Sequence, residues 1–335
     1  MVGLILKAGH LILAFMTVLL FSLSLVVSFS EGVFVVAGIF ALVIIALLDE
    51  KRREFIKNLA KDKIEGASFV KADFHNFLAL IVGALTTYTL SVNFDLGAVV
   101  ASGLVGLTVG LMVPKLAVSA YCGAFVGMSS ALLLPNQTYV LLAAVIAGGL
   151  FVASKAVFNG FGGKLGTIAW TGVVCTALIT GQEFLTGTVP DANVSSMIIA
   201  YAIIGAVVTR VISIRFKHGP VIGSAIVVLA AGLLLPVIHG DGGTLLAVMV
   251  TCATYAGMSN GERVPNEGYM AIAGIFAALI FIFSQPFIQG GGGKLGTTAF
   301  GSVIAVQGMI MMAKQYSAKR ARKQAGPETA RVTDR

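Results

Sequence analysis

Two short glycine-lysine stretches are the part of this sequence whose residue types and spacing could do chemistry. Residues 160–167 read Gly-Phe-Gly-Gly-Lys-Leu-Gly-Thr, and residues 290–297 read Gly-Gly-Gly-Gly-Lys-Leu-Gly-Thr, each between long apolar runs. Glycine frees the backbone from its usual torsional limits. Irregular backbone at membrane depth occurs only where it is buried in protein or lines a wet cavity. Hydrocarbon does not accept the lysine charge unpaired, so two such stretches in register indicate the paired halves of one site.

The chemistry that fits these stretches is the binding of an anionic or strongly polar solute. If each stretch interrupts a helix that restarts at Leu165 or Leu295, the new N-terminus presents free amides and about half a positive charge. The alternative is a pair of ordinary interhelical loops whose lysines extend to lipid headgroups. Neither stretch is a Walker loop, because leucine follows the lysine. The predicted substrate-binding residues are Gly162, Gly163, Lys164, Gly166, Thr167, Gly292, Gly293, Lys294, Gly296 and Thr297.

A second repeated pattern, Gly-Met-Ser, could line a solute pathway. It places Met128 and Ser129 in one copy and Met258 and Ser259 in the other, each a few residues before a Pro-Asn pair. These four residues are the predicted pathway-lining set, provided that the apolar run before each serine enters the membrane only partway. The alternative is that small and hydroxyl residues here serve close helix packing.

Catalysis and metal binding find no support in the sequence. The 15 acidic residues lie at or near predicted span ends, in loops or in the tail, and the 4 histidines form no metal motif. Cys122, Cys175 and Cys252 lie in apolar runs without a C-x-x-C pair. We therefore expect no enzyme activity, no metal, no cofactor and no nucleic-acid partner, and the net charge of +8 is interpreted as a topology signal.

The elements that must position these residues are membrane-spanning helices. Hydrophobic residues make up 57% of the 335 residues and charged residues 11%, with a mean hydropathy of +0.94, whereas a soluble domain carries roughly 25% charged residues. Each span needs about 20 apolar residues, which leaves room for about a dozen. The predicted location is the cell inner (plasma) membrane, multi-pass, with the lipid bilayer as a partner.

The ends of the chain have their own organisation. Residues 1–48 are predicted to form an N-terminal transmembrane hairpin, and residues 49–76 a basic cytoplasmic linker that includes an interfacial helix. Residues 315–335 are predicted to be a basic, disordered cytoplasmic tail. Because lysine and arginine near span ends mark the cytoplasmic side, both termini are placed there.

The middle of the chain is a duplication, repeat 1 at 77–184 and repeat 2 at 185–314. Identities recur at an offset of 122 and, after an insertion of eight residues around His239, at 130. Each repeat holds five apolar runs, and an odd number requires the second copy to enter the membrane from the opposite face. The charges agree, since Asp95 in one loop is matched by Lys217 in the other. The runs are 77–91, 97–113, 116–133, 138–157 and 165–183, then 193–211, 219–237, 244–259, 268–286 and 296–314.

The predicted fold is an all-α polytopic membrane protein with about 12 transmembrane helices. Two N-terminal helices precede a five-plus-five inverted-topology repeat with broken or re-entrant helices. This layout is similar to that of urea transporters and of several secondary carriers, in architecture and without a shared residue motif. Substrate sites of inverted-repeat transporters lie where the repeats meet.

The predicted function is therefore transport of a small polar solute, with an anion favoured, bound between the repeats. One alternative is a channel-like facilitator of a small neutral or anionic solute, since no carboxylate lies within a span. Another is a non-transporting membrane subunit of a larger complex, docked through the basic segment 51–71. A homo-oligomer is left open.

Overall fold

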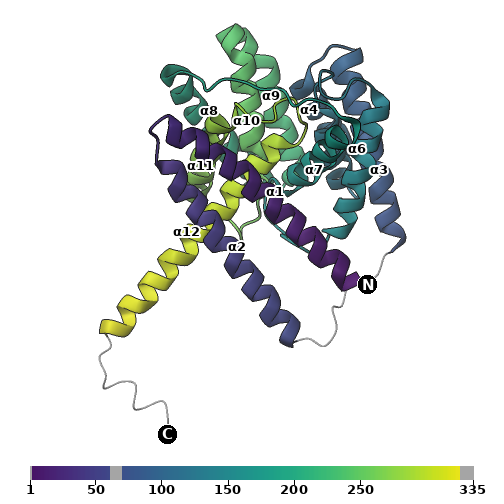
Figure 1. Ribbon diagram of the computed structural model, residues 1–335. Coiled ribbons are helices and arrows are strands. Elements are labelled where there is room, and N and C mark those ends of the chain that lie inside the picture. Colours follow the sequence, from purple (N-terminus) through teal and green to yellow (C-terminus); the bar gives the residue numbers. More distant parts are fainter. Residues whose placement is uncertain (1, 61–69, 325–335) are drawn as a thin grey trace.

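The computed structural model describes residues 2–60 and 70–324, and this part of the chain is helical (Figure 1). An isolated antiparallel bridge joins Leu185 to Gln289. The helices of repeat 1 follow an N-terminal pair, and those of repeat 2 follow the loop that ends at Asp191. In chain order they are α1 (Val2–Ser30), α2 (Val35–Ala60), α3 (Lys71–Tyr88), η1 (Thr89–Asn93), α4 (Ala98–Met112), α5 (Ala117–Gly127), α6 (Gln137–Ala153), α7 (Lys164–Thr180), α8 (Ala192–Arg210), η2 (Val211–Arg215), α9 (Pro220–His239), α10 (Asp241–Gly257), α11 (Glu267–Ser284) and α12 (Lys294–Gln324).

The helices are consistent with a membrane helical protein, as the composition predicts. Among the described residues, 6 helices are long and apolar enough to cross a membrane, and shorter apolar helices accompany them. The shortest is α5, with 11 residues, which at 1.5 Å per residue spans about 16 Å, or half of a hydrocarbon core of about 30 Å. This length fits the predicted partial entry for the third run of repeat 1. The matching helix of repeat 2, α10, has 17 residues and spans about 26 Å, so it does not share this property.

The two sequence repeats form the same succession of elements with the same neighbours. In repeat 1, α3 packs against α5 and α6, and α7 against α5 and α6; in repeat 2, α8 packs against α10 and α11, and α12 against α10 and α11. Matched residues even share unusual backbone angles. Asp95 and Lys217 have φ of 55° and 59°, and Phe158 and Ile288 both have φ of 50°. The duplication therefore extends from residue identities to local geometry.

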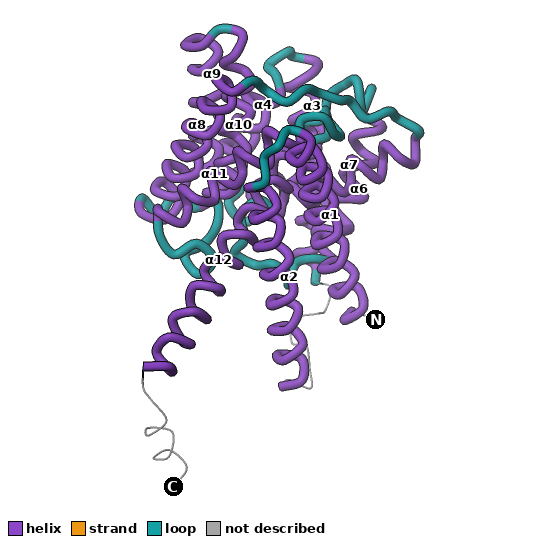
Figure 2. Tube along the Cα trace, turned by 60° about the vertical axis from the view of Figure 1, so that its left-hand side comes forward, coloured by secondary structure: helices purple, strands orange, loops and turns teal. Residues whose placement is uncertain are grey.

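The N-terminal pair packs mainly on repeat 2, and its helix ends lie on the same side of the bundle as the end of α12. Helices α1 and α2 contact each other and α12, and α1 also contacts α11. Figures 1 and 2 show the start of α1, the end of α2 and the end of α12 at the same lower end of the bundle. The arginine- and lysine-rich sequences 51–57 and 314–323 belong to these last two helix ends.

Two of the predicted boundaries are corrected by the helices. Residues 49–60 continue α2 without a break and form no separate interfacial helix, and α3 already begins at Lys71, whereas 61–69 lie outside the described residues. Residues 315–324 were predicted to be disordered, but they continue α12 to Gln324. The reason is propensity: alanine, lysine, arginine and glutamine favour helix, and no glycine or proline follows until Gly326. Residues 325–335 lie outside the described part.

Helices α7 and α12 cross backbone to backbone near their first turns. A Cβ on Gly166 would lie 2.3 Å from the Cα of Gly296, and a Cβ on Gly296 would lie 2.4 Å from the Cα of Gly166. Both helices are extensively buried here, including Thr167 and Thr297. The contact is reciprocal, so the two repeats meet at an axis that passes between these glycines.

Because backbone atoms cannot move aside, Gly166→Ala and Gly296→Ala should each lower stability, by about 2 kcal/mol or more. Gly149→Ala is the matched control, since nothing lies within 4 Å of a Cβ at this helical position. It should leave the melting temperature unchanged or slightly raised. Thermal unfolding of the purified protein measures all three variants, and equal melting temperatures would refute the crossing.

Candidate functional site

Each glycine-lysine stretch lies in the connection between two helices that pack against each other. Helix α6 ends at Ala153 and α7 begins at Lys164, whereas α11 ends at Ser284 and α12 begins at Lys294. We call the connecting segments 154–163 and 285–293 the first and the second break. Helices α7 and α12 begin one residue before the predicted helix starts at Leu165 and Leu295. The N-cap glycines Gly163 and Gly293 have φ of 82° and 91°, a conformation that favours glycine.

The lysines tie each restarted helix to the end of the helix before it. The Lys164 Nζ donates to the carbonyl oxygens of Ser154 and Val157, at 2.7 and 2.6 Å. The Lys294 Nζ donates to the matching oxygens of Ser284 and Phe287, both at 2.6 Å. Carbonyls at a helix C-terminus lack intrahelical partners and carry partial negative charge. An ammonium has three donors, so each lysine retains one for another ligand.

Each break is also held by the serine that follows α10 or α5 in the other repeat. The Gly162 N–H donates to the Ser259 Oγ, and the Gly292 N–H donates to the Ser129 Oγ, both at 3.0 Å. Both serines are buried. They follow the ends of α10 and α5, so the predicted pathway-lining serines instead use their hydroxyls to join the repeats.

Close backbone packing explains the glycines of the breaks. A Cβ on Gly162 would lie 2.3 Å from the Tyr255 carbonyl oxygen, and one on Gly292 would lie 2.2 Å from that of Phe125. Helix α10 contains Tyr255 and α5 contains Phe125. Any larger residue at Gly162 or Gly292 would push its break away from α10 or α5, respectively.

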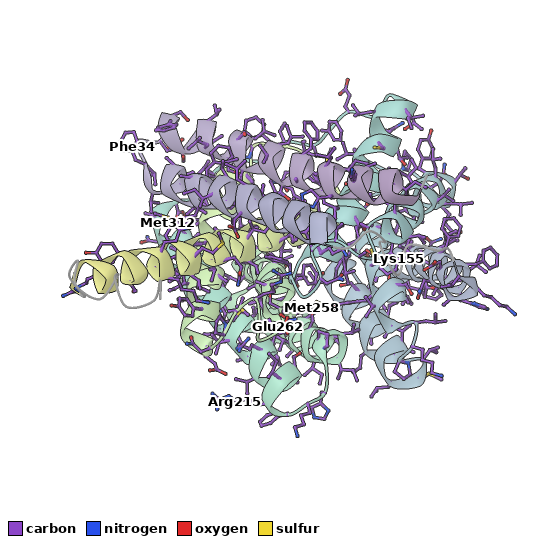
Figure 3. The ribbon with its side chains drawn as sticks, turned by 90° about the horizontal axis from the view of Figure 1, so that it is seen from below. Phe34, Lys155, Arg215, Met258, Glu262 and Met312 are labelled. Atoms are coloured by element: carbon purple, nitrogen blue, oxygen red, sulfur yellow. The ribbon has the colours of Figure 1, made fainter. Side chains whose placement is uncertain are left out.

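A cavity opens at the first break. It has a volume of about 310 Å³. Its lining includes Lys164 of the first glycine-lysine stretch and the aromatic side chains of Phe151 and Phe158. Lys155 and Met258, labelled in Figure 3, also line it. The Lys155 Nζ lies 2.7 Å from the Asp73 Oδ2, which compensates its charge. Among the described residues, no carboxylate lies within ion-pairing distance of Lys164.

The second break is covered by the loop that connects the repeats. The Gln289 N–H donates to the Leu185 carbonyl oxygen at 2.7 Å. Gly290 and Gly187 also pack closely, against Leu185 and against the Gln285 carbonyl respectively. We call residues 181–191 the strap. Figures 1 and 2 show it crossing the upper end of the bundle, opposite the basic helix ends.

Two matched positions differ in a way that changes how the breaks are filled. Phe161 in the first break corresponds to Gly291 in the second, and Leu133 corresponds to Arg263. The Arg263 guanidinium lies over the Phe161 ring, with its Cζ 4.2 Å from the centroid, and its Nε donates to the Asn159 carbonyl. At the second break, Gly291 instead lies against Trp170 and Leu133.

The structure brings the predicted residues together in unequal ways. The two glycine-lysine stretches lie around one crossing, but Lys164 lines the cavity whereas Lys294 is 6% exposed. Thr167 is buried without a hydrogen-bond partner for its hydroxyl, and the Thr297 hydroxyl donates to the Gly293 carbonyl at 3.4 Å. Met258 lines the cavity, and the Met128 Sδ accepts a hydrogen bond from the Tyr255 hydroxyl.

A polar cluster that the sequence did not predict lies between α5, α9 and α10. The Tyr121 hydroxyl lies 3.0 Å from the Ser224 Oγ, which lies 2.9 Å from the Thr254 Oγ1. Tyr121 and Tyr255 are buried edge to face, with centroids 6.3 Å apart. A signal was present in the sequence, because a tyrosine within an apolar run needs a partner for its hydroxyl when buried.

Comparison with protein-family models, with characterised proteins and with solved structures finds no match to this chain. Within the described residues there is also no group of three or more histidine, cysteine, aspartate or glutamate side chains that could hold a metal ion. The geometry of the two breaks is therefore the main indication of function.

If the serine contacts join the repeats, Ser129→Ala and Ser259→Ala should destabilise the protein equally. Each leaves one buried glycine N–H without an acceptor, which costs about 1–3 kcal/mol. Ser196→Ala, whose hydroxyl forms an exposed bond within its own helix, is the control and should have little effect. Chemical unfolding in detergent measures the three variants, and a neutral result for either buried serine contradicts the pairing.

Proposed function

We propose that this protein is a membrane transporter in which a small, anionic solute binds at the crossing of two inverted repeats. The observation that carries the proposal is the state of the breaks: one opens to a cavity lined by Lys164, whereas the matching one is covered by the strap. Alternating access in a transporter built from inverted repeats requires two equivalent breaks, one of which is open while the other is closed.

The inverted orientation has support from the chain path and the charges. In Figure 1, α3 begins near the lower end, beside the start of α1, and α8 begins near the upper end, after the strap. The loop after η2 carries Arg215 and Lys217, whereas the matching loop of repeat 1 carries Asn93 and Asp95. Basic loops mark the cytoplasmic side, so the lower end is the cytoplasmic one.

The cavity favours an organic anion over an inorganic one. Its walls include the aromatic rings of Phe125, Phe151 and Phe158, which suit an apolar group. Lys164 supplies positive charge that no described carboxylate compensates, and one of its donors is not used by helix carbonyls. A small carboxylate with an apolar part satisfies both features.

A channel-like facilitator is less well supported, because the contacts that close the second break would have to separate during each transport event. The strap bridges Leu185 to Gln289, and the Ser130 N–H donates to the Gly290 carbonyl at 2.8 Å. A path blocked in this way needs a conformational change, which is the property of a carrier. A non-transporting subunit has no evident need for a lysine-lined cavity at the meeting point of its repeats.

Lys164→Met and Lys294→Met separate solute binding from the helix tie, because the two lysines make matching carbonyl contacts. Purified protein is first screened by thermal shift against small carboxylates, inorganic anions and urea. For a solute that binds, Lys164→Met should weaken affinity about tenfold or more, since it removes the charge in the cavity. Lys294→Met should change affinity much less. Equal affinity losses in both variants would reject the cavity as the solute site.

A disulfide across the strap tests alternating access. Leu185→Cys and Gln289→Cys, combined in a chain whose 3 native cysteines are replaced, place two thiols on an antiparallel bridge pair. Oxidation should stop solute uptake into proteoliposomes and reduction should restore it. Each single cysteine variant is the control and should transport in both conditions. Uptake that persists in the oxidised double variant would indicate a path that never needs the second break to open.

A further inference from the structure

A groove outside the site runs along repeat 1, between α3, α4 and the start of α5. It has a volume of about 460 Å³, and its walls include Leu78, Val82, Leu104 and Val109. Leu78, Val82 and Leu104 are 42%, 62% and 38% exposed. In a membrane protein, such a groove faces the bilayer, where an unfilled apolar hollow loses packing on one side.

In repeat 2, a tyrosine and an insertion lie at the positions that correspond to the groove of repeat 1. Ala79, in the groove wall, corresponds to Tyr201, whose hydroxyl lies 2.7 Å from the His239 Nε2. The insertion around His239 also lengthens α10 to 17 residues, against 11 in α5. Its Gly243 packs tightly against the Leu235 carbonyl of α9. Repeat 1 lacks both the tyrosine and the insertion, so neither feature fills its groove.

One end of the groove is basic. His75, Val113 and Leu116 line this end together. Lys71 precedes His75 by one helical turn, and its carbonyl lies 2.9 Å from the His75 Nδ1. Lys115 lies between the two lining residues of the α4–α5 turn, and both lysine side chains are exposed.

The charge of this end is specific to repeat 1. Lys71, His75 and Lys115 correspond to Asn193, Met197 and Val237 in repeat 2, where no cation is placed. The nearby carboxylate of Asp73 is engaged by the Lys155 ammonium and by the Val70 N–H. Its negative charge is therefore compensated within the protein, and the two lysines give the groove end a net positive charge.

We propose that this groove binds an anionic phospholipid, with an acyl chain between α3 and α4 and the phosphate at Lys71 and Lys115. The basic end lies with the start of α3, on the side of the basic helix ends (Figure 1). Anionic lipids of the cytoplasmic leaflet attract basic groups beside membrane spans, and basic pockets between helices bind their headgroups. The site depends on the membrane architecture and is independent of whether the protein transports a solute.

The test compares two lipids with identical acyl chains, dioleoyl-phosphatidylglycerol and dioleoyl-phosphatidylcholine, added to the full chain purified in detergent. Phosphatidylglycerol should raise the melting temperature by about 3 °C more than phosphatidylcholine. Lys71→Asn with Lys115→Val, the residues that repeat 2 carries, should abolish this difference. Lys217→Gln, an exposed lysine of the other repeat, is the control and should keep it. An equal shift from both lipids in the unmodified protein overturns the charge assignment.

Ala79→Tyr should fill the groove and remove the response to both lipids, and an unchanged response would overturn the acyl-chain assignment. If the variant does not fold, quenching by lipid with brominated acyl chains replaces this measurement. Thr108→Trp, in a Trp170→Phe background, should be quenched more by brominated phosphatidylglycerol than by brominated phosphatidylcholine. Val145→Trp, on an exposed face of α6, should be quenched equally by the two. A lipid-free dimer that Ala79→Tyr converts to monomer would show a second copy in the groove and contradict the proposal.

Discussion

The constraint on which the rest of the structure depends is the backbone contact between α7 and α12. Without a side chain at Gly166 or Gly296, the two helices approach until the Cα atoms limit them. This approach places both N-termini at the axis between the repeats. It also brings each break within hydrogen-bonding distance of a serine of the opposite repeat, Ser259 after α10 or Ser129 after α5. The helix crossing and the hydrogen bonds between the repeats support each other, because each glycine N–H meets its serine where the helices approach this closely.

The lysines contribute to this frame before they contribute to binding. A helix that ends inside a membrane protein leaves carbonyl oxygens that water cannot satisfy. Lys164 and Lys294 satisfy two each, and in doing so attach the end of one helix to the start of the next. The lysine in each break thus supplies hydrogen-bond donors to the carbonyl oxygens that the end of the preceding helix leaves without partners. The charge that stabilises the break is also the charge a solute would meet.

Identities at fixed offsets and runs of glycine are visible without coordinates, so the sequence predicted two matching series of apolar runs and a helix start at each glycine-lysine stretch. Helices α7 and α12 begin there. The partner of each serine was not predictable. Small residues in an apolar run fit close packing as well as a pathway, and only the relative position of the repeats decides that Ser259 accepts from Gly162. The end of α12 differs from the predicted disordered tail, because the alanine, lysine, arginine and glutamine residues of 315–324 favour helix.

Differences between the repeats carry more functional information than their identities do. The identities build two equal frames: glycine crossing, lysine tie and serine contact occur in both. At the positions that fill the frames, Phe161 and Arg263 face each other at one break, whereas Gly291 and Leu133 meet at the other. In the proposed transporter each frame adopts two states, and equal scaffolds mean that neither state is favoured by its backbone contacts. The preference for one state is left to the few side chains and the strap that differ, and their contacts are the ones a bound solute would have to outweigh.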